Sequence, residues 1–168
     1  MPRDRSTLRP RVALGAVLAL GAALLAGCSS TVALQSPPAS DDPRCAELMV
    51  RLPAAFDDQD RRWTDAQSTA AWGDPTTVQL ACGVTPPGPT ELPCQSVSGV
   101  DWIVDDSQAP LYRITTYGRV PAVELIIDYD AVSSRGPVDA VSRVIVDRFE
   151  TDAACVAASE VTPDAEAP

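Results

Sequence analysis

The placement of five cysteines constrains this chain more than any other feature. Cys28 directly follows an uncharged apolar run, whereas Cys45, Cys82, Cys94 and Cys155 are spread along the rest of the sequence. Four cysteines in an exported domain predict two disulfides, for which three connectivities are possible. Zinc is the competing interpretation, but the sequence has no histidine and no Cys-x-x-Cys pair. We therefore expect a disulfide-linked fold in an oxidising compartment.

The N-terminal segment has the pattern of an export signal. Four arginines at positions 3, 5, 9 and 11 precede 16 uncharged residues at 12–27, which is the order of a basic and then an apolar signal region. The stretch Leu25-Ala26-Gly27-Cys28 resembles the lipobox of bacterial lipoproteins, in which the cysteine thiol receives a diacylglyceryl group. The alternative, an uncleaved spanning helix, needs roughly 20 apolar residues. We expect a signal peptide at 1–27 and attachment to membrane lipid through Cys28, on the extracytoplasmic face of the cell membrane.

The charge of the mature chain disfavours some partners. Beyond residue 27 the chain carries nine arginines, no lysine and 22 acidic residues, a net charge of −13. Such a surface repels phosphate backbones, so nucleic acid is not an expected partner. It also repels anionic lipid headgroups, so we expect the domain to stand off the membrane. The flexible tether is assigned to residues 28–41, which are polar and contain Pro37-Pro38.

The sequence predicts a helix near each end of the domain. Asp42 suits an N-cap and Pro43 suits the first helical position, and this helix ends before Pro53. Gly136-Pro137 introduces the second helix, whose apolar residues have the spacing of an amphipathic helix. Those residues are Val138, Val141, Ile145 and Phe149. Composition predicts a disordered acidic tail at 158–168.

Four strands are predicted between the two helices. They are 76–82, 97–104, 111–117 and 122–129. Residues 56–68 are polar and acidic and receive no element, 70–75 is predicted as a short helical turn, and 83–93 is a proline-rich loop. Short turns between successive strands favour antiparallel pairing. The expected fold is one α+β domain at 42–157, with a four-stranded antiparallel sheet covered on one face by two helices and stapled by disulfides.

Candidate catalytic groups are few. The sequence has neither histidine nor lysine, which removes the commonest general base and the Schiff-base nucleophile. Carboxylate clusters remain, and such clusters can serve a glycan hydrolase or bind calcium. The candidates are Asp101 with Asp105 and Asp106, and Glu124 with Asp128 and Asp130. Solvated surface acids are the simpler interpretation, and no EF-hand spacing is present. We therefore assign no catalytic residue, no metal ligand and no cofactor.

Four residues are candidate binding features, namely Trp72, Asp101, Trp102 and Arg119. Arg119 follows a predicted turn, where a guanidinium can meet a carboxylate ligand. The alternative for each tryptophan is a role as a core anchor. Arg119 can equally pair with Glu124 or Asp101.

A series of short motifs resembles a known family. The motifs are Cys45-x-x-Leu48, Leu52-Pro53, Ala70-Ala71-Trp72-Gly73-Asp74-Pro75, Ala81-Cys82-Gly83-Val84, Gly99-Val100-Asp101-Trp102 and Thr115-Thr116-Tyr117-Gly118-Arg119. Over roughly residues 45–150 they are similar to domain of unknown function 3515, a group of predicted lipoproteins from high-GC Gram-positive bacteria. The resemblance implies an exported, membrane-attached protein with no assigned activity. It also favours the pairs Cys45–Cys82 and Cys94–Cys155, with Cys82–Cys94 as the alternative.

The function favoured by these features is a non-catalytic one. The tether, the disulfides and the lack of a catalytic set indicate a lipoprotein that acts as a binding or assembly module, with another envelope protein as its partner. Two alternatives remain at this point: a carboxylate-dependent hydrolase of cell-envelope glycans, and a lipoprotein that binds a small ligand or a metal.

Overall fold

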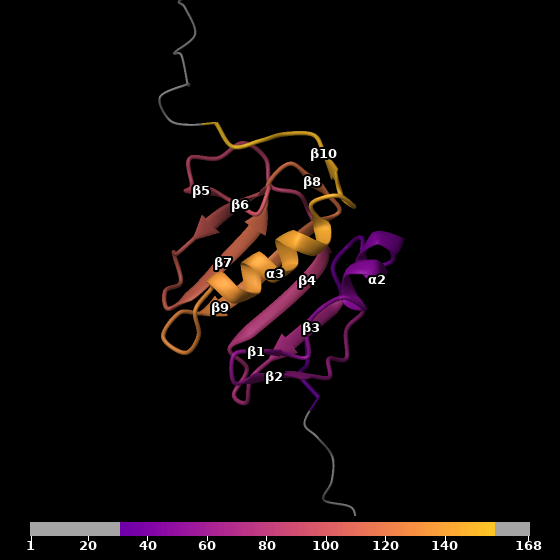
Figure 1. Cartoon of the computed structure of the whole chain (residues 1–168), viewed down its shortest axis with the longest axis vertical. Coiled ribbons are helices and arrows are strands. Elements are labelled where there is room, and N and C mark those ends of the chain that lie inside the picture. The colour runs from indigo at the N-terminus through magenta and orange to yellow at the C-terminus, as the bar shows by residue number, and fades with distance from the viewer. Residues whose placement is uncertain (1–30, 157–168) are drawn as a thin grey trace, which may run out of the picture. The chain divides into compact units, whose positions relative to one another are not determined.

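A large antiparallel sheet forms the centre of the domain (Figure 1). The structure is a computed structural model that describes residues 31–156. Eight strands pair in the order β1 (Ala55–Phe56), β2 (Gln59–Arg62), β3 (Thr69–Trp72), β4 (Val78–Val84), β9 (Ala122–Asp128), β7 (Leu111–Thr116), β6 (Val100–Asp105) and β5 (Cys94–Val97). A second, two-stranded sheet pairs β8 (Arg119–Val120) with β10 (Glu150–Thr151). The described residues contain two helices, α2 (Pro43–Met49) and α3 (Arg135–Ile145).

Strand β9 joins two halves of the sheet. The strands β1 to β4 pair in chain order, and so do β5, β6 and β7. Strand β9 follows both groups in the sequence and lies between them, paired with β4 on one side and β7 on the other. Leu125 of β9 is therefore opposite Leu80 of β4 and Ile114 of β7. This register aligns three apolar side chains across the middle of the sheet.

The hydrophobic core lies between the sheet and α3. Alternate residues of β4 and β9 are buried, as expected for strands with one covered face. The inward residues of these strands are Val78, Leu80 and Cys82 in β4, and Val123, Leu125 and Ile127 in β9. Helix α3 packs Val138, Val141 and Ile145 against them. Full burial of such side chains contributes about 1.5–3 kcal/mol each.

The predicted four-stranded sheet was wrong, and the N-terminal half of the sheet shows why. Strand β1 forms one edge of the sheet and β2 lies next to it. Near an edge, the polar sequence of residues 59–62 is compatible with a strand. All four residues of β3 are buried, so this strand has no alternation of apolar and polar residues. Gly73, with a φ of 88°, ends β3 and has the appearance of a helix breaker in the sequence. Residues 70–72 are thus strand and not helix.

The opposite edge of the sheet was missed for a different reason. Most of the predicted strand at 97–104 is β6, but Val97 is the last residue of β5, which was not predicted and which turns into β6 through Ser98 and Gly99. Both turn residues have a positive φ, 49° and 78°, as a two-residue hairpin turn of type I′ requires. Because β5 is short and mostly exposed, its sequence carries no apolar alternation.

The two predicted helices are present, but both are shorter than the sequence suggested. The Asp42 side chain accepts a hydrogen bond from the Arg44 amide at 2.8 Å, and Pro43 occupies the first turn of α2, which confirms this N-cap. Helix α3 ends at Ile145, so Cys155 lies well beyond it. Within residues 31–156, neither helix has the length and apolar character needed to cross a membrane.

Residues 31–41, which the sequence places in the tether, lie along the domain. The Val32 amide donates to the Trp63 carbonyl at 2.8 Å, and the Ala39 amide donates to the Gly83 carbonyl at 2.9 Å. Gly83 has a φ of 96°, and a Cβ there would lie 2.3 Å from the Ala39 carbonyl oxygen. This close approach requires glycine. Cys28 and the predicted tail at 158–168 lie outside the described residues.

Candidate functional site

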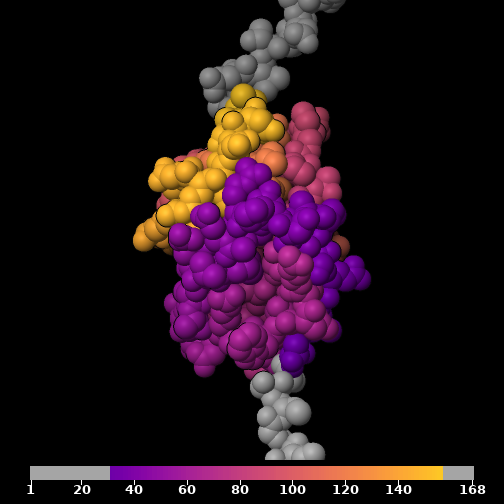
Figure 2. Space-filling model, turned by 90° about the vertical axis from the view of Figure 1, so that its right-hand side faces the viewer, coloured from indigo at the N-terminus to yellow at the C-terminus, as the bar shows by residue number. Residues whose placement is uncertain are grey.

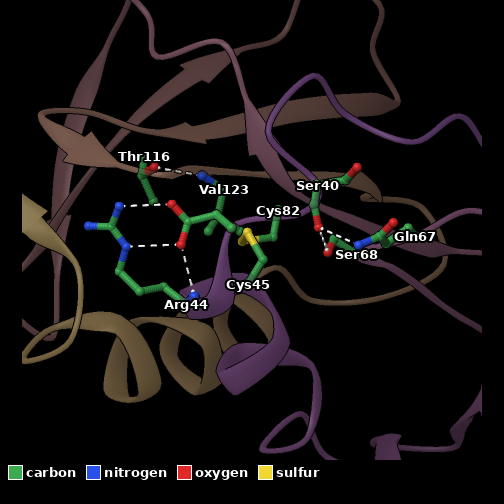
Figure 3. Close-up of a disulfide and its surroundings, with 9 residues drawn as sticks. Ser40, Arg44, Cys45, Gln67, Ser68, Cys82, Thr116 and Val123 are labelled. Carbon is green, nitrogen blue, oxygen red and sulfur yellow. Dashed lines mark hydrogen bonds and ion pairs between the residues drawn. A yellow bond between two sulfur atoms is a disulfide. The ribbon is translucent and has the colours of Figure 1, made fainter.

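The first disulfide, Cys45–Cys82, belongs to the hydrophobic core. It joins α2 to β4 with a Cα–Cα distance of 5.5 Å, and both cysteines are fully buried (Figure 3). Close to it, the Thr116 hydroxyl accepts a hydrogen bond from the Val123 amide at 2.9 Å. With every group around it packed or hydrogen-bonded, this disulfide is a structural element and not part of a surface site.

The second disulfide, Cys94–Cys155, lies at the surface. It joins the first residue of β5 to the C-terminal segment, with a Cα–Cα distance of 6.0 Å. Cys94 is exposed and Cys155 is half-buried. The Cys155 amide donates to Asp101 Oδ2 at 2.7 Å, which fixes the C-terminal segment against β6. The two disulfides have the pairing that the family resemblance favoured.

A cavity of about 630 Å³ opens beside the second disulfide. Ile103 of β6 and Tyr117 form its floor, the proline-rich loop with Leu92 and Pro93 forms one wall, and the C-terminal segment with Val156 forms the other. Glu91 contributes a negative charge to the lining. The volume and the mixture of apolar walls with a few polar groups are typical of binding sites.

A smaller hollow of about 260 Å³ lies on the opposite face of the same strands. Gln95 and Val97 of β5 line it, together with Trp102 of β6 and Val138 of α3. Arg135, the first residue of α3, contributes a positive charge to the lining. Strand β5 therefore has a concave surface on each of its two faces.

The two tryptophans predicted as binding candidates are core residues. Trp72 and Trp102 are almost completely buried. The Trp72 indole donates to the Pro53 carbonyl at 3.2 Å, and the Trp102 indole donates to the Ser142 hydroxyl at 2.9 Å. Because both indole N–H groups have partners within the protein, burial in the core accounts for the two tryptophans without a ligand.

Arg119 is a structural residue that joins three segments. Its guanidinium donates to the carbonyls of Val146 at 3.0 Å, Phe149 at 2.9 Å and Gly99 at 2.8 Å. The side chain thereby connects β8 with the residues after α3 and with the β5–β6 turn. The sequence had suggested Glu124 or Asp101 as the partner of Arg119. Instead, Glu124 pairs with Arg113, and Asp101 accepts a hydrogen bond from the Cys155 amide.

The acidic residues singled out in the sequence do not form a common cluster. Glu124 pairs with Arg113, and Asp128 accepts a hydrogen bond from the Asp130 amide at 3.0 Å. Ser107 donates to Asp105 from its side chain and from its amide, and these hydrogen bonds lower the pKa of the Asp105 carboxyl. In the part of the chain that the structure describes, no group of three His, Cys, Asp or Glu residues is placed to hold a metal ion.

Apart from Cys94 and Cys155, the residues that line the larger cavity were not singled out from the sequence. Ile103 carried the one signal, since it is an apolar residue on the face of its strand that also holds Asp101 and Asp105. Leu92 lies in a loop without periodicity, and Val156 comes from a segment far away in the sequence. The second disulfide and the hydrogen bond from the Cys155 amide to Asp101 bring these segments together.

These features define a class of protein: a domain with one large antiparallel sheet, one core disulfide, and one surface disulfide beside a cavity at a sheet edge. The chain belongs to the family described as Protein of unknown function (DUF3515), whose model matches residues 10–154. This confirms the family predicted from the motifs. No curated protein sequence and no solved structure matches the chain.

Proposed function

We propose that this protein is a lipoprotein attached to the extracytoplasmic face of the cell membrane through Cys28, and that its domain binds a partner without catalysing a reaction. The observation that carries the proposal is the use of the cysteines. The two disulfides take up the four cysteines other than Cys28. Disulfides of this kind persist in oxidising compartments outside the cytoplasm, and the remaining cysteine follows an export signal.

The binding site in this proposal is the cavity beside Cys94–Cys155. Its volume of about 630 Å³ lies within the range of known ligand sites. A disulfide that fixes one wall of the cavity reduces the entropy lost on binding, because the wall is already ordered. The carboxylates that a hydrolase would need are engaged separately, with Arg113 for Glu124 and with Cys155 for Asp101.

The start of the described chain and the cavity lie at opposite ends of the domain (Figure 1). Val32 is bonded to the domain, and the four residues from Cys28 to Val32 can span at most about 14 Å. Trp63, whose carbonyl accepts the Val32 amide, is 79% exposed. The indigo start of the described chain lies at one end of the domain and β5, β8 and β10 lie at the other (Figure 1). Figure 2 shows the C-terminal segment, in yellow, at that other end. The cavity lies at the end that holds β5 and the C-terminal segment.

Fractionation of cells that express Cys28→Ala tests the anchor, with Ser29→Ala as the matched control. We expect the alanine variant at Cys28 to leave the membrane fraction and to lose labelling by an alkyne-bearing fatty acid, while Ser29→Ala keeps both. Both variants should retain two disulfides by thiol mass-tagging. If Cys28→Ala stays in the membrane fraction until detergent is added, the protein has an uncleaved membrane anchor.

The non-catalytic part of the proposal has its own test. The purified lipidated protein is incubated with isolated cell-wall glycan, and soluble fragments are measured. We expect no turnover. Release of fragments that is abolished by Asp101→Asn or Glu124→Gln would contradict the proposal and establish a hydrolase.

A further inference from the structure

Strand β5 is a free edge with backbone groups that point away from the sheet. The Val104 amide donates to the Pro93 carbonyl at 2.8 Å, and the Tyr117 amide donates to the Asp101 carbonyl at 2.8 Å. Alternate residues of β6 therefore bond to β5 and to β7. It follows that Gln95 and Val97 bond toward β6, whereas the N–H and C=O groups of Cys94 and Ser96 point outward.

These outward groups lack a partner within residues 31–156, because β5 is the last strand in the order of the sheet. Cys94, Gln95 and Ser96 are all exposed. A strand with unpaired N–H and C=O groups is a template for pairing with a further strand. The two donors and two acceptors of Cys94 and Ser96 match the spacing of an extended polypeptide.

The hollows on the two faces of β5 match the alternating side chains of such a strand. A residue opposite Cys94 has its side chain on the face of Cys94 and Ile103, where the cavity of about 630 Å³ lies. A residue opposite Gln95 has its side chain on the face of Gln95 and Trp102, where the hollow of about 260 Å³ lies. Strand addition combines main-chain hydrogen bonds with pockets for alternate side chains in this manner.

Among the described residues, the opposite edge of the sheet, formed by β1, has neither a strand of four residues nor a hollow on each face. Strand β1 contains two residues, and Asp57 and Asp58 follow it directly. Short length and charged flanks are common protections of an edge strand. The two edges therefore differ, and only β5 combines four residues with a cavity on one face and a hollow on the other.

Charge decides between a second copy of this chain and a different protein. The mature chain carries nine arginines against 22 acidic residues, a net charge of −13, so two copies repel each other. A cationic segment is attracted by the same field, and Glu91 in the larger cavity adds a local negative charge. The apolar linings select apolar side chains at the positions that enter the two hollows.

We propose that the partner of this lipoprotein is an extended, cationic segment of another envelope protein, which adds to β5 as a further strand and places apolar side chains alternately in the two hollows. This proposal deepens the proposed function and rests on it, since it uses the same cavity. It assigns to Cys94 and Ser96 the main-chain contacts, and to the Cys94–Cys155 disulfide the task of holding the cavity open beside them.

The probe for this proposal is a phage-displayed library of random decapeptides, panned on the full lipidated protein in detergent. The enriched peptides are then measured against Ser96→Pro and the matched control Ser96→Ala. Proline removes the outward N–H of Ser96 and is tolerated where a strand faces solvent, whereas alanine keeps the donor. We expect cationic peptides with alternating apolar residues, binding at least tenfold weaker to Ser96→Pro and within twofold of wild type to Ser96→Ala.

N-methylation of single peptide amides adds a test that does not depend on the stability of a protein variant. Methylation at every second amide should abolish binding, and methylation at the amides between them should leave it unchanged. The proposal is overturned if no peptide is enriched, if Ser96→Pro binds as well as wild type, or if methylation has no alternation. A dimer that Ser96→Pro dissociates, seen by analytical ultracentrifugation, would assign the edge to a second copy instead. None of these outcomes changes the membrane attachment of Cys28, so the two proposals fail separately.

Discussion

Cys45 and Cys82 are fully buried and join α2 to β4 in the middle of the sheet, whereas Cys94 is exposed and joins the edge strand β5 to the C-terminal segment. The first disulfide is packed among core side chains on all sides. The second has a cavity beside it and a free strand edge next to it. The two disulfides therefore serve different purposes in this domain. Cys45–Cys82 stabilises the core, and Cys94–Cys155 positions surface segments around a site.

The largest expected effect is the loss of the core disulfide. The loop closed by Cys94–Cys155 is longer, 61 residues against 37, and chain entropy alone makes it more stabilising by only about 0.4 kcal/mol. Removing the two buried sulfur atoms of Cys45–Cys82 leaves a void in the core, and this void lowers the free energy of unfolding by more than about 0.4 kcal/mol. We expect Cys45→Ala/Cys82→Ala to lower the free energy of unfolding by about 3–5 kcal/mol, and Cys94→Ala/Cys155→Ala by about 2 kcal/mol.

Urea unfolding of the full chain measures both variants. The opposite order would show that loop length, and not burial, determines the stability that each disulfide contributes.

Stepwise reduction of the two disulfides sharpens the same comparison. Because thiol exchange needs access to a sulfur, mass-tagging should find Cys94 and Cys155 reduced before Cys45 and Cys82.

The next largest effect is expected at Arg119, which supports the region around the second disulfide. Arg119→Ala leaves the carbonyls of Val146, Phe149 and Gly99 without their charged donor. We expect a loss of about 2–4 kcal/mol in urea unfolding. Arg143→Ala is the matched control, because Arg143 is exposed and makes an i,i+4 pair with Asp139. That control should change stability by no more than about 0.5 kcal/mol, and equal effects of the two variants would contradict this role of Arg119.

A substitution at Gly118 is expected to disturb the C-terminal segment more than the core. Gly118 has a φ of 62°, and a Cβ there would lie within 1.9 Å of the Ala153 carbonyl oxygen. Gly118→Ala should therefore displace the wall of the larger cavity and lower stability by about 1–2 kcal/mol. It should also weaken binding of a selected decapeptide. Gly136→Ala, at a helical position with nothing within 4 Å of the new Cβ, should instead raise stability by about 0.5–1 kcal/mol.

The smallest effect is a pH dependence at Asp42, in the N-terminal region. The hydrogen bonds from Arg44 lower the pKa of the Asp42 carboxyl below its ordinary value. This group therefore stabilises the fold at pH values above the pKa of the unfolded chain, and the contribution is lost as the pH falls through the lower, folded pKa. Asp42→Asn keeps an N-cap but loses the charge, at a cost of about 0.5 kcal/mol near neutral pH. The difference between the two proteins should shrink in acid unfolding experiments below about pH 4.

The parts of the fold that the sequence predicted are those with one covered face. Strands β4, β7 and β9 and helix α3 alternate buried and exposed residues with the period of their element. Strand β3 was missed because both of its faces are covered, and β2 because its residues are polar. The size of the sheet therefore could not be inferred from hydrophobic periodicity.

The candidate site was less predictable than the fold. Its floor consists of Ile103, an apolar residue on a polar face, and Tyr117, and its walls come from residues near 92 and near 155. A disulfide with a sequence separation of 61 residues unites them, and local patterns contain no information on such a contact. The family resemblance supplied the pairing, but not the cavity that results from it.

In the proposed function, the edge of the sheet at Cys94–Cys155 binds an extended segment, and the core region around Cys45–Cys82 does not take part. Amide hydrogen exchange of the full lipidated protein, with and without a selected decapeptide, tests it most directly. The prediction is that exchange slows at the outward amides of Cys94 and Ser96 and is unchanged at the amides around Cys45 and Cys82. Protection at the β1 edge or around Cys45–Cys82, with Cys94 and Ser96 still exchanging freely, would contradict the claim.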